Sequence, residues 1–357
     1  MTGQSITADR PDALAWLPGW PLISAKLMEI RRRRVLIVVI VLFTVGLPVI
    51  FLGIRLIFHL ADPKLYGPAG SPGIFAGVSD LMNEFGFIVA ATLGATAGTT
   101  DLTDGMFRHL VLTGRSRFAL YLARIPAGLA IIVPLAGAGF AVVCLVTAFL
   151  GTPQPSSVHD NGVAIPVHLS QAQLGSWIVS HPQQAQDAFI GPGPLTAGSV
   201  PTMTGRQLGS IYGNYTAAEA ASLNPSPASM AEAGLWIELD LLIAFTVGLG
   251  LGSLMGQRTV PIILLIFLDV IITPLLASHV LPYFLDGQRL IVGVAMDQLQ
   301  PAGLVGGATL RPGGGGGGNH PALQIPPMPT WAMIAVIVGW IGGWSALGAW
   351  RMATRDA

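Results

Sequence analysis

The chain has 357 residues, of which 52% are hydrophobic and 10% charged, and its formal net charge is zero. Soluble domains carry about 25% charged residues, so this composition excludes an ordinary soluble protein and indicates a surface that largely avoids water. The balanced charge excludes nucleic-acid binding through a bulk basic field. The single cysteine, Cys144, lies in an apolar run and leaves no partner for an intrachain disulfide.

The first 34 residues are predicted to form a cytoplasmic N-terminus that ends in an amphipathic helix, starting near Pro21 and lying in the membrane surface. Tryptophan favours the headgroup region, and clustered arginines favour anionic lipid. The alternative, compatible with the first, is that the arginines only orient the first span. We expect no signal peptide, because the first apolar run is too long for the core of one. The expected membrane anchors are Trp16, Trp20, Arg31, Arg32, Arg33 and Arg34.

Six segments are apolar enough and long enough to span a membrane, which requires about 20 residues. The predicted spans cover residues 35–57, 74–100, 118–150, 234–256, 259–280 and 330–350. The sequence therefore predicts an all-α polytopic membrane protein, with residues 35–350 forming one transmembrane domain. Glycines at small-xxx-small spacing, Gly94 with Gly98 and Gly248 with Gly252, predict close helix packing within the chain or across a dimer.

The distribution of lysine and arginine predicts the orientation, because cytoplasmic loops carry an excess of both. Most of the 18 lysines and arginines fall on one side if the N-terminus is inside. Both termini are therefore expected in the cytoplasm, including the tail 351–357, and the protein is expected in the cell membrane. The long segments 151–232 and 282–329 then lie outside. The six glycines at 313–318 predict a flexible tether, since no Lys-Ser or Lys-Thr follows as in a phosphate loop.

The segment 101–117, between the second and third predicted spans, is a short charged insert that predicts a helix between two bends. Asp101 can cap its start, Phe107 and Leu110 belong to an apolar face at helical spacing, and Gly114 ends it. Such a helix suits docking to a partner on the cytoplasmic side. The alternative is an ordinary loop packed on its own bundle.

The same segment carries residues in an order that recurs in one transporter family. An acidic residue ends the second span, glycine follows four residues later, and a leucine-containing helix, a turn, a Ser-Arg pair and a basic residue come next. The positions are Asp101, Gly105, Leu110, Gly114, Ser116, Arg117 and Arg124. The chain thereby resembles the membrane subunits of ABC-2 type transporters, although that family more often has Glu at position 101 and Thr at position 106. Residues 248–258, 274–276 and 281–285 are similar to later parts of the family.

The resemblance implies the permease subunit of an ATP-driven exporter. Two membrane subunits, this chain with a second copy or a related permease, would form the path, and two copies of a separate ATP-binding subunit would drive it. The chain has no Walker A motif, so it is not expected to be an enzyme, and ATP and Mg are expected on the partner. The implied coupling residues are Asp101, Asp104, Gly105, Phe107, Arg108, Leu110, Arg115 and Arg117. The alternative is a membrane scaffold or sensor that moves no solute.

Ionisable residues within spans are expensive and are functional candidates. Asp269, Glu84 and Glu238 are candidates for the translocation path or the dimer interface. For Asp269 and Glu84 the alternative is a polar contact inside the bundle, and for Glu238 a solvated position near the outer end. No Cys or His spacing typical of a metal site occurs, so no metal is expected.

Overall fold

The computed structural model describes residues 18–63, 66, 68–70, 74–103, 116–151, 157–160, 163–166, 180, 225–268, 287, 289–301, 304 and 328–354. Within these residues, five helices are long and apolar enough to cross a membrane. They are Arg34–Ala61, Ile74–Asp101, Arg117–Leu150, Pro227–Met255 and Thr330–Thr354. They correspond to five of the six predicted spans. The other, 259–280, begins as helix α12 (Thr259–Phe267), and its residues from 269 onward lie outside the described part.

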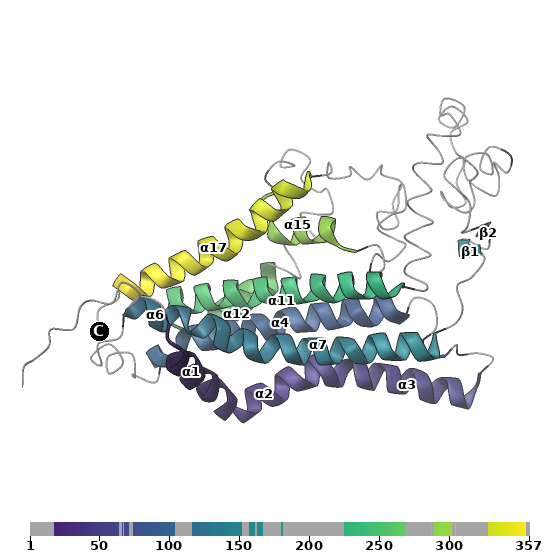
Figure 1. Cartoon of the computed structure of the whole chain (residues 1–357), viewed down its shortest axis with the longest axis horizontal. Helices are drawn as coiled ribbons and strands as arrows, with labels where there is room; N and C mark the ends of the chain where they lie inside the picture. Colours follow the sequence, from purple (N-terminus) through teal and green to yellow (C-terminus); the bar gives the residue numbers. More distant parts are fainter. Residues whose placement is uncertain are drawn as a thin grey trace, which may run out of the picture.

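The long helices run side by side in alternating directions (Figure 1). We call the end of the bundle where helix α1 lies the α1 end. The residues at the helix termini there are Thr103, Arg117, Met255 and Thr354. The termini at the opposite end are Ala61, Ile74, Leu150, Pro227 and Thr330. Many large apolar side chains on the outer faces are exposed, as expected of helices that face lipid rather than water.

Helix α1 (Trp20–Arg32) lies obliquely at this end and packs on α7 (Figure 1). Its buried residues, Leu22, Lys26 and Ile30, recur every four positions and therefore form one face. The helix stops at Arg33, where the backbone leaves helical geometry (φ −80°, ψ 72°), and α2 (Arg34–Val41) starts in a new direction.

The first span contains a wide turn. Between α2 and α3 (Leu47–Ala61) lies a π-helical turn, η1 (Leu42–Gly46), where Leu47 N–H donates to Leu42 O. Pro48 follows and has no N–H to donate to the carbonyl four residues earlier, so the register shifts by one residue at this point. The turn packs against α7.

Helix α11 (Pro227–Met255) is the central helix. In its most apolar window 72% of residues are buried, against 22% in the first and last spans. It packs most extensively on α4 (Ile74–Thr103). A Cβ added to Gly248 would lie 2.5 Å from Ala91 O, and one added to Gly252 would lie 2.6 Å from Ala95 O. The predicted glycine packing is therefore made within the chain, where the two backbones approach closely.

The remaining helices complete the bundle. The third span consists of α6 (Arg117–Leu122) and α7 (Arg124–Leu150), and the last is α17 (Thr330–Thr354). Short helix α15 (Val292–Leu299) lies between α11 and α17, as Figure 1 shows. Trp236 Nε1 on α11 donates to Met296 O in α15 at 2.9 Å, which fixes its position.

Outside the bundle, the described residues include a pair of short strands. Strands β1 (Ser157–Asp160) and β2 (Val163–Pro166) pair antiparallel, with Ser157 opposite Pro166. They belong to the segment 151–232, which the sequence predicts to lie outside the membrane. The all-α prediction therefore holds for the described membrane-spanning part, and the hairpin is an addition that it did not include.

Candidate functional site

The strongest cluster of charges in the described residues lies at the α1 end, where four side chains from three helices meet. Asp101, in the last turn of α4, is 3% exposed. Its Oδ1 accepts from Lys26 Nζ of α1 at 2.5 Å, and its Oδ2 accepts from Arg124 Nη2 of α7 at 2.5 Å. Glu29, also on α1, accepts from Lys26 at 2.9 Å. We call Lys26, Glu29, Asp101 and Arg124 the charge cluster.

Arg124 is the most deeply buried member, at 1% exposed. Besides its bond to Asp101, it donates from Nη1 to Gly98 O at 3.1 Å, one turn earlier in α4. Ser253 of α11 also donates to Gly98 O, at 3.4 Å. The two bonds to Gly98 join α7 and α11 to a carbonyl near the end of α4. Residue 98 has no side chain, and an added Cβ would lie 2.6 Å from Leu249 O, so glycine allows this approach.

The charge cluster is electrically balanced, because two cations face two carboxylates. Burying a single charge costs several kcal/mol, and an excellent geometry with further hydrogen bonds is needed to offset that cost. Asp101 has a cation on each of its two oxygens, and Arg124 also has a backbone acceptor. Such an arrangement fixes three helix positions relative to one another more than it adds net stability.

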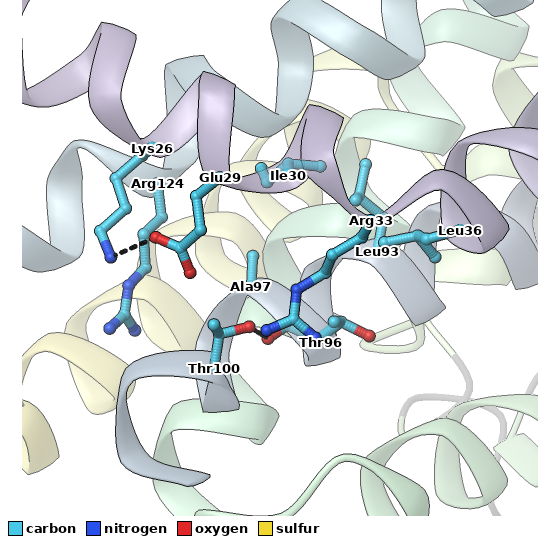
Figure 2. A pocket seen from close by; sticks show the side chains of 10 residues that line it. All are labelled: Lys26, Glu29, Ile30, Arg33, Leu36, Leu93, Thr96, Ala97, Thr100 and Arg124. Carbon is cyan, nitrogen blue, oxygen red and sulfur yellow. Dashed lines mark hydrogen bonds and ion pairs between the residues drawn. The ribbon is translucent and has the colours of Figure 1, made fainter. Parts of the chain in front are cut away.

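The space beside the charge cluster is too small for a substrate. Figure 2 shows Lys26, Glu29 and Arg124 around a cavity bounded on the other side by Thr96, Thr100 and Arg33. Its volume is about 10 Å³, the lower limit for one water molecule. This cavity therefore has no room for a ligand larger than water.

The charge cluster flanks the segment predicted to couple to a partner. Six of the eight predicted coupling residues lie outside the described residues: Asp104, Gly105, Phe107, Arg108, Leu110 and Arg115. Asp101 is buried, and its carboxylate is occupied by Lys26 and Arg124. The chain is described again from Ser116, whose Oγ accepts from Ala119 N at 3.1 Å and caps α6. Arg117, also a predicted coupling residue, donates to Ala353 O of α17 at 2.9 Å.

Of the three predicted path residues, Glu84 and Glu238 lie in the described part of the chain, on different helices. Glu84 lies on α4 and is exposed. Glu238 lies on α11 and faces α7, where a Cβ on Gly137 would come within 3.4 Å of its Oε1. Asp269 lies outside the described residues.

The predicted membrane anchors are partly visible. Trp20 starts α1 and is 74% exposed, and Arg31, Arg32 and Arg34 are exposed. Arg33 is half-buried and reaches towards Thr96 on α4 (Figure 2). Trp16 lies outside the described residues.

Sequence reasoning did not identify Lys26 as a site residue and used Arg124 for the orientation and for the family resemblance. The pattern that points to Lys26 is its place between Leu22 and Ile30 at four-residue spacing, which puts it on the buried face of α1. A buried lysine requires an acidic partner. The sequence does not say which one, because Lys26 and Asp101 are 75 residues apart.

No group of three or more His, Cys, Asp and Glu side chains in the described part of the chain could hold a metal ion. Comparison of the sequence with protein-family models and with curated proteins finds no match.

Proposed function

We propose that this chain is the membrane subunit of an ATP-driven exporter, coupled to a separate ATP-binding subunit through residues 101–117 and working as a dimer. The observation that carries the proposal is the charge cluster. It holds the end of α4 and the start of α7, the two helices on either side of this segment, and it attaches α1 to both.

A force on the segment would reach most of the bundle through these contacts. Asp101 joins α4 to α1 and α7, and Ser253 joins α4 to α11. Arg117 attaches the other side of the segment to α17. An ordinary loop does not require buried charges where it joins its two helices. The free-energy cost of burying the charge cluster therefore favours a segment that transmits movement.

ATP can act only through different affinities for two states of the transporter. In the proposed mechanism the partner binds residues 101–117 and moves them when it closes around ATP. Because the buried ion pairs resist separation, α1, α4 and the start of α7 then move as one unit. The path opens between the two membrane subunits, and the chain itself hydrolyses nothing.

The test is purification of the full chain from its native membrane in mild detergent, followed by mass spectrometry. The variants Arg108→Ala and Leu110→Ala lie in the proposed coupling segment, and Arg351→Ala in the last turn of α17 is the control. Recovery of an ATP-binding subunit with the parent and the control, and its loss from the two variants, supports the proposal. If no ATP-binding subunit accompanies the parent chain, the proposal is wrong.

A second experiment separates the exporter from a scaffold or sensor. The complex is reconstituted into proteoliposomes, and ATP hydrolysis and solute movement are measured together. An exporter couples the two, whereas a sensor hydrolyses ATP without moving any solute.

A further inference from the structure

We infer that the chain binds an anionic phospholipid in a groove at the α1 end, between α2, α4 and α12. The groove has a volume of about 650 Å³, within the range of about 300–1,000 Å³ common for ligand sites. Among the described residues, the charged side chains that line it are all arginines: Arg32, Arg33, Arg34 and Arg258. This lipid site is independent of the proposed transport function.

The arginines come from two distant parts of the sequence. Arg33 and Arg34 lie at the junction of α1 and α2, and Arg258 lies in the short connection between α11 and α12. Gly256 makes this connection possible, because it ends α11 with a left-handed backbone (φ 71°) that glycine adopts without strain. An arginine run that only orients the first span does not require Arg258 to converge on the same groove.

Several guanidinium groups around one groove repel one another unless an anion lies between them. No acidic side chain among the described residues lines the groove. Arginine binds phosphate through two parallel N–H donors, which makes it the favoured residue for this anion. Thr259, at the start of α12, and Thr96, on α4, add hydroxyl groups to the lining. The polar part of the groove therefore fits a phosphate group.

The rest of the groove is apolar and suits an acyl chain rather than a free phosphate ion. Val35, Val39, Ile262 and Ile263 line it. Val35 is 80% exposed and Ile263 is 61% exposed, so the groove opens onto the outer face of the bundle. A phospholipid with its headgroup among the arginines could extend its tail along this apolar face.

The position of the groove along the bundle agrees with headgroup depth. The span Arg34–Ala61 has 28 residues, and at 1.5 Å per residue it is about 42 Å long, which matches a bilayer including its headgroups. Arg34 at its first position therefore lies among the headgroups of one leaflet. The apolar lining follows directly after it in the sequence.

The test is native mass spectrometry of the purified full chain in detergent, titrated with dioleoyl phosphatidylglycerol or with dioleoyl phosphatidylcholine. We expect the anionic lipid to bind about tenfold more tightly or better. The double variant Arg34→Gln/Arg258→Gln should weaken its binding by tenfold or more, since a hydrogen bond to a charged phosphate contributes about tenfold. Phosphatidylcholine binding should change little.

Two matched controls address charge and shape. Arg31→Gln removes an exposed arginine from the same run that does not line the groove. Because salt screens a charge that does not contact the bound headgroup, this change should alter binding less than about twofold. Ile263→Trp keeps all the arginines and fills the apolar part, so it should weaken binding of the anionic lipid. Because the substituted side chains are exposed, these variants should retain the parent's helix content by circular dichroism.

Three results would overturn the inference. The first is equal affinity for the two lipids. The second is equal loss on Arg31→Gln and on the double variant, which indicates diffuse surface charge rather than a groove. The third is displacement of bound phosphatidylglycerol by millimolar inorganic phosphate, with Ile263→Trp unchanged, which indicates a free-phosphate site.

Discussion

Arg124 and Asp101 form a buried ion pair between the start of α7 and the end of α4. The Nη2 to Oδ2 distance is 2.5 Å, and the two residues are 1% and 3% exposed. Lys26 occupies the other oxygen of Asp101 and brings α1 into the same contact. The single carboxylate of Asp101 therefore connects the end of α4 to the start of α7 and to α1.

Replacing Asp101 by asparagine should destabilise the protein strongly. Asp101→Asn leaves Lys26 and Arg124 buried without their shared anion, and removal of one partner from a buried ion pair costs about 3–5 kcal/mol. We expect a clear fall in the unfolding temperature in detergent, followed by fluorescence. Asp101→Glu keeps the charge, so its unfolding temperature should fall much less.

Glu29→Gln provides the control for this change, because the Glu29 side chain is 36% exposed and lies at the edge of the charge cluster. Loss of the Glu29 charge should lower the free energy of unfolding by no more than about 1 kcal/mol. If Asp101→Asn unfolds at the parent's temperature, Asp101 does not hold α1, α4 and α7 together.

Removing the charge of Lys26 should loosen the packing of α1 and leave the ion pair between Asp101 and Arg124 in place. Lys26→Met keeps the pair between Asp101 and Arg124 and retains an apolar stem for the buried face of α1. Hydrogen exchange in Trp20–Arg32 should therefore accelerate, with little change in α7. Arg31→Gln, an exposed change in the last turn of α1, should leave exchange as in the parent. Equal acceleration in both variants would mean that α1 is held by something other than Lys26.

The positions of the spans could be predicted from the sequence because a long apolar run has few alternatives to a membrane helix. The second predicted span, 74–100, starts at the same residue as α4 (Ile74–Thr103), and the last, 330–350, starts at the same residue as α17. The ends are less well predicted, since polar residues such as Arg351 continue a helix past the hydrocarbon.

The charge cluster could not be predicted in the same way. Counting Lys26 as a cytoplasmic charge describes its effect on orientation but not its burial. Two lysines or arginines near the end of a span look alike in a sequence, and only the packing of α1 against α7 decides which one meets Asp101. The wide turn before Pro48 could not be predicted either. A proline inside an apolar run predicts a disturbed helix but not the π-helical geometry of the disturbance.

Adding a methyl group where α4 and α11 touch should destabilise the bundle. Gly248→Ala places a Cβ 2.5 Å from Ala91 O, too close for the backbones to remain where they are, and overpacking of this kind costs about 1–3 kcal/mol. Gly342→Ala in α17 is the matched control, because nothing lies within 4 Å of its added Cβ. It should be neutral or slightly stabilising in the same thermal measurement. A similar effect of both changes would indicate that the contact between the two helices is looser than described.

Arg117 distinguishes a structural from a coupling role at the other side of the segment. Its bond to Ala353 O is exposed, and exposed polar contacts contribute little, so Arg117→Gln should change the free energy of unfolding by no more than about 1 kcal/mol. If Arg117 also contacts an ATP-binding subunit, the same variant should recover clearly less of that subunit on copurification. Arg351→Gln, in the last turn of α17, should affect neither quantity. If the variant loses both stability and the ATP-binding subunit, Arg117 acts through the fold alone, because a partner cannot bind the start of α6 once it has unfolded.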